Sequence, residues 1–513
     1  MSESASADRG AATQSTESRL IVASNRLPIA LRPGEGGEVR VTPSDGGLAR
    51  ALWPLVERSR GTWIGWPGVA AEDLDPAAVA RALAAWPGLR GVSLSRAEVE
   101  AYYAGFSNSV LWPLFHGLAS RCEFGCGGFA SYRRVNERFA DAITVALEGR
   151  SGAVWIHDYH LMLVAERLRA RDIRARLGLF LHTPFPALDD LLKLPWRAEL
   201  LRALLAHDVI GVQSARDLRR FLACIDRLVA GVAVAERGAR EALLRVADGR
   251  EIVAGVFPIG IDTAPFERAR DEVGVAQKAA ALREGTGEKT IALGVDRLDY
   301  TKGLLERLRA FDRALDRHPE LVGRIVLVQV VVPSREQVPA YARLRRDVER
   351  EVGRISGRFA TAGWAPIRFL YRALSPEELL ALYREADIAL VTPLADGMNL
   401  VAKEYCASKL DRPGVLVLSE MAGAACQLRD GALLVNPYDE EATADAIWRA
   451  FSMPYAERAE RAHALREIVA TRDVHWWGEA FMASLLRDAP APAAAAEVLP
   501  TVDVGPPRAA GAT

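Results

Sequence analysis

Two carboxylates, Asp396 and Glu404, frame the stretch of the chain that is richest in residues able to bind a ligand. The apolar run before them is typical of a buried parallel strand, Gly397 permits a tight turn, and Asn399 or a neighbour can begin a helix whose free N–H groups bind an anion. On a largely helical path, eight residues separate the carboxylates by roughly 12 Å at about 1.5 Å per residue. Because a glycosidase pair lies about 5–9.5 Å apart, we interpret these two as clamps on opposite ends of a long ligand.

Two cations, Arg297 and Lys302, follow a second apolar run and precede a helical pattern. Arg can hold a phosphate through two hydrogen bonds and Lys adds a compact charge, so the pair suits a diphosphate. The alternative is that both form surface salt bridges with Asp296 and Asp299. The glycine and the helix start that follow favour phosphate binding.

Arginines also follow two other apolar runs. Arg335 comes after the run 325–331, and Arg26 comes after the first run of the chain. Arginines at three strand ends are explained if two phosphate-bearing ligands meet in one cleft. Gly47, in a Gly-Gly pair, can bring the backbone close to a phosphate as well.

Acidic and imidazole groups end two further runs. Asp158 lies between His157 and His160, and His182 ends the next run. We interpret His157 and His160 as hydrogen-bonded core residues. Asp158 and His182 lie where a doubly wound sheet presents its ligands, so we expect both to face the cleft.

Aromatic residues gather in the segments 63–66 and 102–113, which include Trp66, Tyr103 and Trp112. Such residues are most often core, but Trp and Tyr also form platforms for sugars. Composition alone leaves that choice open.

The composition is that of a globular protein with no general affinity for nucleic acid or membranes. The chain has 513 residues, half of them hydrophobic, and a net charge of −1, so two domains are expected. Five scattered cysteines make a poor disulfide framework and suit a reducing cytoplasm. Cys122 and Cys126 have no second half-site at ligand spacing, so no metal is expected.

Short apolar runs alternate with helical patterns, which indicates an α/β fold with parallel sheets buried on both faces. The alternation stops near residues 257–262 and begins again at 289. We therefore expect two doubly wound, Rossmann-like domains facing a central cleft. The expected division is a disordered tail (1–17), an N-terminal domain (18–258), a C-terminal domain (259–475), a helix returning to the N-terminal domain (476–487) and a second disordered tail (488–513). The expected strands are 20–24, 152–156, 177–181, 209–212, 290–294, 325–331, 388–391, 415–418 and 433–435.

These motifs, in this order, resemble the trehalose-6-phosphate synthases, which are retaining glycosyltransferases of the GT-B fold. The similarity runs from residue 18 to residue 477 and includes Ser-Asn-Arg-Leu-Pro (24–28), His-Asp-Tyr-His-Leu (157–161), Arg-Leu-Asp-Tyr-Thr-Lys-Gly (297–303) and Ser-Glu-Met-Ala-Gly (419–423). The resemblance implies transfer of glucose from a nucleotide-glucose, with UDP-glucose favoured, to glucose 6-phosphate. The products are then α,α-trehalose 6-phosphate and a nucleoside diphosphate.

The resemblance also implies a role for each matching residue, with the acceptor in the N-terminal domain and the nucleotide sugar in the C-terminal one. The residues implied to bind the acceptor are Arg26 and Arg335 on its phosphate, with Trp66, Tyr103, Trp112 and Asp158 lining its pocket. The residues implied to bind the donor are Arg297, Lys302 and Gly47 at the diphosphate, His182 and Asp396 at the glucose, Glu404 at the ribose, and the backbone of Gly397, Met398, Asn399 and Leu400.

The implied chemistry is mostly electrostatic, with Asp158, His182, Arg297 and Lys302 as the catalytic group. The two cations stabilise the leaving diphosphate, whose oxygen can accept the proton of the acceptor hydroxyl on the same face. No metal and no cofactor are then needed. The resemblance further implies a cytoplasmic homo-oligomer, a tetramer.

The chain departs from the family pattern at Ala395, where the family usually has Arg before the Asp-Gly-Met-Asn motif. The lost charge bears on donor choice, acceptor choice or a supporting salt bridge. We also expect a polar loop at residues 33–45 that is longer than in some bacterial members. Because no phosphatase domain follows Arg487, the product is expected to leave still phosphorylated.

Two rival functions remain open. A related synthase joins ADP-glucose to glycerol 3-phosphate and makes glucosylglycerol phosphate, but its smaller acceptor needs fewer aromatic walls than Trp66, Tyr103 and Trp112 supply. A silent homologue that senses sugar phosphates would be expected to lose one of four residues, and this chain retains all of them: Arg297, Lys302, Asp396 and Glu404.

Overall fold

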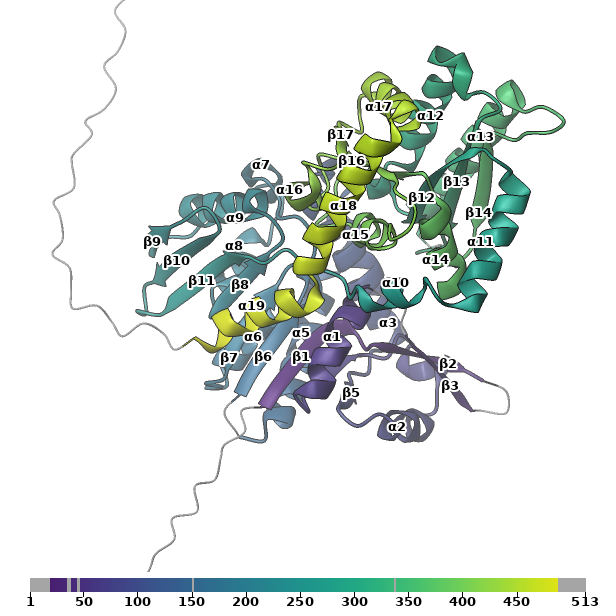
Figure 1. Cartoon of the computed structure of the whole chain (residues 1–513). Coiled ribbons are helices and arrows are strands. Elements are labelled where there is room, and N and C mark those ends of the chain that lie inside the picture. Colours follow the sequence, from purple (N-terminus) through teal and green to yellow (C-terminus); the bar gives the residue numbers. More distant parts are fainter. Residues whose placement is uncertain (1–18, 35–37, 44–46, 150–151, 336–337, 488–513) are drawn as a thin grey trace, which may run out of the picture.

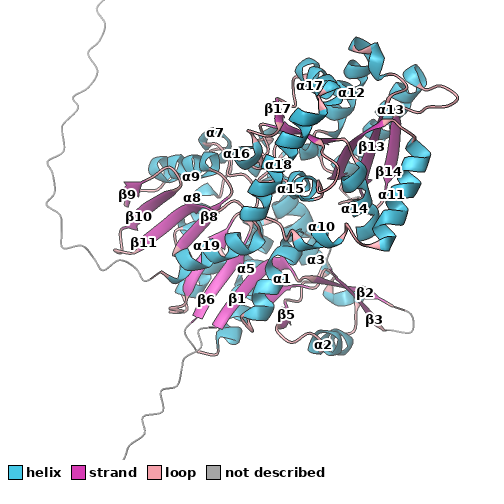
Figure 2. Ribbon diagram, viewed as in Figure 1, coloured by secondary structure: helices cyan, strands magenta, loops and turns pink. Residues whose placement is uncertain are grey.

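The computed structural model describes residues 19–34, 38–43, 47–149, 152–335 and 338–487, which form two large sheets with helices packed on them (Figures 1 and 2). Each strand expected from the sequence is present. The two tails expected to be disordered, 1–17 and 488–513, lie outside the described residues.

The first sheet has nine strands in the order β5-β4-β1-β6-β7-β8-β11-β10-β9. All pairs are parallel except those of β10, which runs antiparallel to β9 and β11. The prediction of a purely parallel sheet is therefore wrong at this edge, because the connections on both sides of β10 are too short for a crossover. The strands are β1 Arg19–Arg26, β4 Thr62–Trp66, β5 Leu89–Gly91, β6 Gly152–His157, β7 Arg176–Phe180, β8 Val209–Val212, β9 Val232–Arg237, β10 Glu241–Val246 and β11 Glu251–Val256.

The second sheet has six parallel strands in the order β14-β13-β12-β15-β16-β17. This is the Rossmann order 3-2-1-4-5-6, and the first six strands of the other sheet repeat it. The order in which successive strands are added to the sheet reverses between β1 and β6 and between β12 and β15. Sheets of this type bind ligands at such points, at the carboxyl ends of the strands. The strands are β12 Thr290–Arg297, β13 Ile325–Val332, β14 Ile367–Tyr371, β15 Ile388–Val391, β16 Val415–Ser419 and β17 Leu433–Val435.

Helices cover both faces of the sheets. In β1, Ile21 and Ala23 enter one hydrophobic core and Leu20 and Val22 enter another, as expected for a strand buried on both sides. The helices are α1 Gly47–Arg58, α2 Pro76–Ala84, α3 Arg96–Glu98, α4 Trp112–Phe115, α5 Phe129–Leu147, α6 Val164–Arg169, α7 Leu188–Leu191, α8 Arg197–Leu204, α9 Ala215–Leu228, α10 Ala264–Arg268, α11 Val273–Thr286, α12 Leu304–Arg317, α13 Pro339–Phe359, α14 Pro376–Glu385, α15 Leu400–Ala407, α16 Ala425–Leu428, α17 Glu440–Ser452, α18 Tyr455–Thr471 and α19 Val474–Leu486.

Two segments near the site differ from expectation. Residues 33–45 were expected to be a loop, but β2 (Ile29–Pro33) and β3 (Val39–Pro43) pair as an antiparallel hairpin. Ile29 and Leu31, which alternate along β2, are both buried, as expected for a strand with one buried face. The aromatic segment is a π-helix, η3 (Val99–Leu111), a rare form that occurs often at functional sites.

The chain passes twice between the two sheets, once at residues 257–263 and again before α19. The two passages lie together, because Val474 N–H donates to the carbonyl of Ile261 at 3.1 Å. The helix α19 then packs on β7 and β8 of the first sheet (Figure 1). There, the ring of Phe481 stacks on Trp155 at a centroid separation of 4.5 Å.

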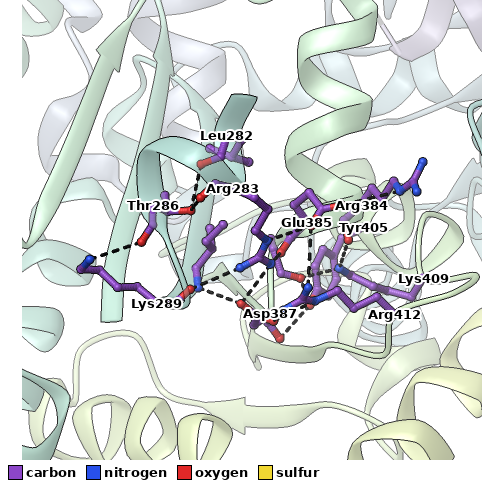
Figure 3. Close-up of polar contacts among 12 residues, drawn as sticks. Leu282, Arg283, Thr286, Lys289, Arg384, Glu385, Asp387, Tyr405, Lys409 and Arg412 are labelled. Carbon is purple, nitrogen blue, oxygen red and sulfur yellow. Dashed lines mark hydrogen bonds and ion pairs between the residues drawn. The ribbon is translucent and has the colours of Figure 1, made fainter. Parts of the chain in front are cut away.

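A charged network fixes the amino end of the second sheet (Figure 3). Asp387, just before β15, accepts a hydrogen bond from Ile291 N–H of β12 at 2.9 Å and another from Arg412 at 2.9 Å. Arg283 donates to Glu385 at 2.8 Å. Strands β12 and β15 are therefore tied at one end, and their opposite ends carry the polar residues of the cleft.

Candidate active site

The carboxyl ends of β12 and β15 bring a cation and an acid together. Lys302 Nζ lies 2.5 Å from Asp396 Oδ2, and their side chains are only 13% and 14% exposed. Asn399 Nδ2 donates to the same oxygen at 3.0 Å. Burial acts to raise the pKa of Asp396, but the charge and hydrogen bond of Lys302 together with nearby positive charges such as Arg297 outweigh burial and lower that pKa. Asp396 is therefore a carboxylate held in place by two donors.

The alternative of surface salt bridges to Asp296 and Asp299 is wrong. Both acids are buried, and each has another partner: Asp296 pairs with Arg307 and Asp299 with Arg335. The cations Arg297 and Lys302 are thus not engaged by those two acids.

The start of α15 offers unpaired backbone donors. Its first helical residue is Leu400, and Asn399 caps it with a positive φ of 76° and no side-chain capping bond. Among the described residues, no backbone acceptor is paired with the N–H groups of Met398, Asn399 or Leu400. These donors lie next to Asp396 and form the anion-binding arrangement predicted from the sequence.

At Gly397 the second half of the molecule, which carries β12 to β17, lies against the first half, which carries β1 to β11. A Cβ built on it would lie 1.8 Å from the carbonyl oxygen of His182, which follows β7 in the other half. A Cβ on Gly423 would lie 1.7 Å from the carbonyl of Gly397. Any side chain at Gly397 would therefore push the carboxyl ends of the two sheets apart.

Arg26, at the end of β1, lies over two aromatic rings of the first half. Its guanidinium carbon is 4.5 Å from the centroid of Trp66 and 5.3 Å from that of Tyr103. Burial acts to raise the pKa of Tyr103, but the charges of Arg26 and Arg335 lower it overall. The side chain of Arg26 is exposed, so it remains available to an anion.

Two arginine side chains of the second half lie over the ring of Trp112. The guanidinium carbon of Arg335 is 4.5 Å from its ring centroid, and that of Arg297 is 5.8 Å away. Arg335 also donates to Tyr341 Oη at 2.5 Å and lies 3.4 Å from Asp299. Neither Tyr341 nor Asp299 could be predicted as a support of Arg335, because their contacts arise only from tertiary folding.

Asp158 follows β6 in a strained conformation, with φ 72° and ψ 170°. That region is essentially restricted to glycine and costs about 1–3 kcal/mol in other residues. The strain turns its carboxylate to the backbone N–H of His182, which donates to Asp158 Oδ1 at 3.2 Å. Burial raises the pKa of Asp158 to about 6, against the N–H groups of Tyr159 and His182, which lower it.

The two histidines beside Asp158 are buried, as expected. His157 Nδ1 lies 3.1 Å from His182 Nε2, so the hydrogen-bonded interpretation holds for it. For His160 it is wrong: neither ring nitrogen has a partner among the described residues. Its ring is packed between Tyr159 and Tyr103, at centroid separations of 4.0 and 6.0 Å.

Glu404 lies away from Asp396, on a mainly apolar cavity of about 610 Å³ between the two halves. Tyr383 Oη donates to Glu404 Oε2 at 2.7 Å. Gly47 begins α1, and Trp53 of that helix lines the cavity with Leu400. The lining of the cavity includes Leu400, the first residue of α15, but neither Lys302 nor Asp396.

No group of three or more potential metal ligands occurs in the ranges that the structure covers. None of the helices within those ranges has the length and apolar character needed to cross a membrane.

Two units of Rossmann strand order make up a GT-B fold, which this chain shares with the trehalose-phosphate synthase structures it resembles. The fold predicted from the sequence is confirmed. The chain belongs to glycosyltransferase family 20, whose model matches residues 18–487.

Similarity to named proteins supports this family membership. The chain is similar to the trehalose-6-phosphate synthase of Mycolicibacterium smegmatis, with 41% identity over 94% of this chain and 95% of the relative. It is 44% identical to a bifunctional trehalose-6-phosphate synthase/phosphatase of Thermoproteus tenax over 91% of this chain, but spans only 63% of that protein's length. Among solved structures, it resembles the UDP-forming α,α-trehalose-phosphate synthase of Burkholderia xenovorans in complex with glucose-6-phosphate. That match has a TM-score of 0.81 and 36% identity and covers 91% of this chain and all of the other. The family resemblance read from the motifs is thereby confirmed.

Proposed function

We propose that this protein transfers glucose from UDP-glucose to glucose 6-phosphate with retention, giving α,α-trehalose 6-phosphate and UDP. The observation that carries the proposal is that two cationic groups face one cleft. Arg26 and Arg335 lie on aromatic rings, whereas Lys302 lies beside the start of α15. One group suits the phosphate of an acceptor, and the other suits the diphosphate of a donor.

The donor occupies the second half in this proposal. Its glucose hydroxyls bind Asp396, which the ion pair with Lys302 holds ionised. The diphosphate lies against Arg297, Lys302 and the free N–H groups before α15. The nucleoside extends to Glu404, where the cavity of about 610 Å³ has room for a ribose and a base.

The acceptor occupies the first half. The rings of Trp66 and Tyr103, whose centroids are 5.7 Å apart, and the ring of Trp112 have apolar faces, which suit a pyranose ring. The phosphate binds between Arg26 and Arg335, and Asp158 accepts a hydrogen bond from a sugar hydroxyl. The relatives named trehalose-6-phosphate synthases support this choice of acceptor, as does the related structure that contains glucose-6-phosphate.

The reaction breaks the bond between C1 of the donor glucose and the diphosphate oxygen, and forms a bond from C1 to the anomeric hydroxyl oxygen of the acceptor. The leaving diphosphate accepts the hydroxyl proton on the same face, so the configuration at C1 is retained. Arg297 and Lys302 stabilise the charge that develops on the leaving group. Because side-chain cations neutralise this negative charge, we propose that neither a metal nor a cofactor takes part.

The proposal is tested with a panel of UDP-, ADP- and GDP-glucose against glucose 6-phosphate and glycerol 3-phosphate. Release of UDP with formation of trehalose 6-phosphate is expected. Turnover only with glycerol 3-phosphate would instead identify a glucosylglycerol-phosphate synthase, and binding without turnover of any pair would identify a sensor. Light scattering on the same preparation tests the proposed homo-oligomer.

A further inference from the structure

His157 and His182 form a pair of neighbouring rings at the carboxyl ends of β6 and β7. His157 Nδ1 and His182 Nε2 are 3.1 Å apart, and the ring centroids are 5.4 Å apart. This distance is that of a hydrogen bond, which needs a proton on one of the two nitrogens and a lone pair on the other. The direction of this hydrogen bond decides whether His182 presents an N–H donor or a bare nitrogen acceptor to a ligand.

Both rings are neutral. Burial lowers the pKa of His157 well below its usual value, and the neighbouring His182 adds to the effect. Burial lowers the pKa of His182 to about 3. A neutral imidazole has one N–H donor and one bare nitrogen, so the shared bond fixes both tautomers together.

The surroundings of His157 favour one direction. Its ring packs against Trp155 and Trp477, at centroid separations of 4.8 and 6.3 Å, and against Phe180 at 6.5 Å. The polar atoms of these rings are the indole N–H groups, which are donors only. Both indole nitrogens and His157 Nε2 are buried without a partner among the described residues.

A proton on His157 Nε2 would therefore be a third buried N–H donor among rings that offer no acceptor except their faces. Buried donors without acceptors are rare and costly. A lone pair at His157 Nε2 is instead compatible with the indole donors through one buried water. The proton of His157 then lies on Nδ1.

We propose that His157 is a positioning residue that donates its Nδ1–H to His182 Nε2 and so keeps His182 in the Nδ1–H tautomer. His182 then presents a donor, not an acceptor, to the ligand. Its ring is partly exposed, and no described residue is hydrogen-bonded to its Nδ1. The natural recipient is a hydroxyl oxygen of the transferred sugar. This last step rests on the proposed function, whereas the tautomer itself does not.

The tautomer is measured directly by ¹⁵N NMR of the full-length protein labelled at histidine, with the His182 signals identified by their loss in His182→Gln. We expect Nε2 of His182 to have the shift of an unprotonated nitrogen and Nδ1 that of a protonated one. The opposite pattern would overturn the proposal, whatever the enzyme's activity. A failure of the proposed function would leave this measurement unaffected.

Two variants separate positioning from packing. The amide nitrogen of Asn lies near the position of His Nδ1, so His157→Asn can still donate, whereas His157→Leu cannot. We expect His157→Asn to keep the His182 tautomer and most of kcat. His157→Leu should lose the tautomer preference and reduce kcat roughly 10- to 100-fold with little change in either KM. If His157→Leu keeps both the tautomer and kcat, or if both variants lose kcat equally while the tautomer is unchanged, His157 has no positioning role.

Discussion

The guanidinium carbon of Arg335 lies 4.5 Å above the ring centroid of Trp112, and this contact joins the two halves of the molecule. Arg335 follows β13 and has a positive φ of 51°, whereas Trp112 begins α4 of the other half. The stacked face, with Tyr341 and Asp299 behind it, fixes an arginine side chain that is only 10% exposed. The contact therefore holds a cation at the boundary where an acceptor would meet the donor.

Arg335→Ala should raise the KM for glucose 6-phosphate roughly 10- to 100-fold, because a hydrogen bond to a charged group contributes about 1.5–3 kcal/mol. The KM for UDP-glucose should change much less. Steady-state kinetics with each substrate varied in turn measures both values. Arg345→Ala is the matched control, because Arg345 also stacks on a tyrosine, Tyr371, at 4.1 Å. Equal effects on both substrates would contradict the assignment.

Lys302→Met should reduce kcat roughly 100-fold or more, because the lost cation stabilises charge that develops only in the transition state. The KM for UDP-glucose should rise less than kcat falls. Lys278→Met, at an exposed position of α11, serves as the control and should leave kcat unchanged. A variant with normal kcat and a raised donor KM would restrict Lys302 to ground-state binding.

Gly397→Ala should reduce kcat/KM roughly 100-fold, because a displacement of about 1 Å in a reacting group can have that effect. The added Cβ meets the carbonyl of His182, and neither backbone can yield without moving its sheet. Gly353→Ala on α13 is the control, since nothing lies within 4 Å of its added Cβ. The control should raise the free energy of unfolding by about 0.5–1 kcal/mol. Full activity of Gly397→Ala would show that the halves do not meet at this point during turnover.

The pH profile should report Asp158, whose pKa burial raises to about 6. The carboxylate form accepts the hydroxyl hydrogen bond, so activity should fall roughly tenfold per pH unit below that value and level off above it. The acceptor phosphate has its own second pKa near 6. We therefore compare the ratio of wild-type to Asp158→Asn kcat/KM, in which the phosphate titration cancels. A ratio that does not vary between pH 5 and 8 would exclude a role for ionised Asp158.

Periodicity and strand-end chemistry were enough to predict nine of the strands and the polar residues at the carboxyl ends of several of them. Buried parallel strands such as β15 are continuous apolar runs, and polar residues at their carboxyl ends have few structural reasons to be there. That is why Arg297, Lys302 and Asp396 could be proposed as site residues from sequence. Their assignment to particular ligand groups stays a prediction.

Pairings made across long sequence separations could not be predicted. The ion pair of Lys302 with Asp396 and the hydrogen bond of His157 with His182 depend on which strands become neighbours. The π-helix Val99–Leu111 has no simple apolar period, because its turns are wider than those of an α-helix. The hairpin of β2 and β3 was missed because charged residues and a glycine-rich centre resemble a loop.

The position of α19 determines when the first half of the protein can complete its folding during synthesis. Phe481 and Trp477 complete the aromatic layer under β6 and β7, yet they are among the last described residues of the chain. Domains generally fold as units during synthesis, beginning with the N-terminal one. Here, the ribosome must synthesise the entire second sheet before the helix that closes the first can leave the exit tunnel. The first half therefore emerges early with an open apolar face and completes its folding last.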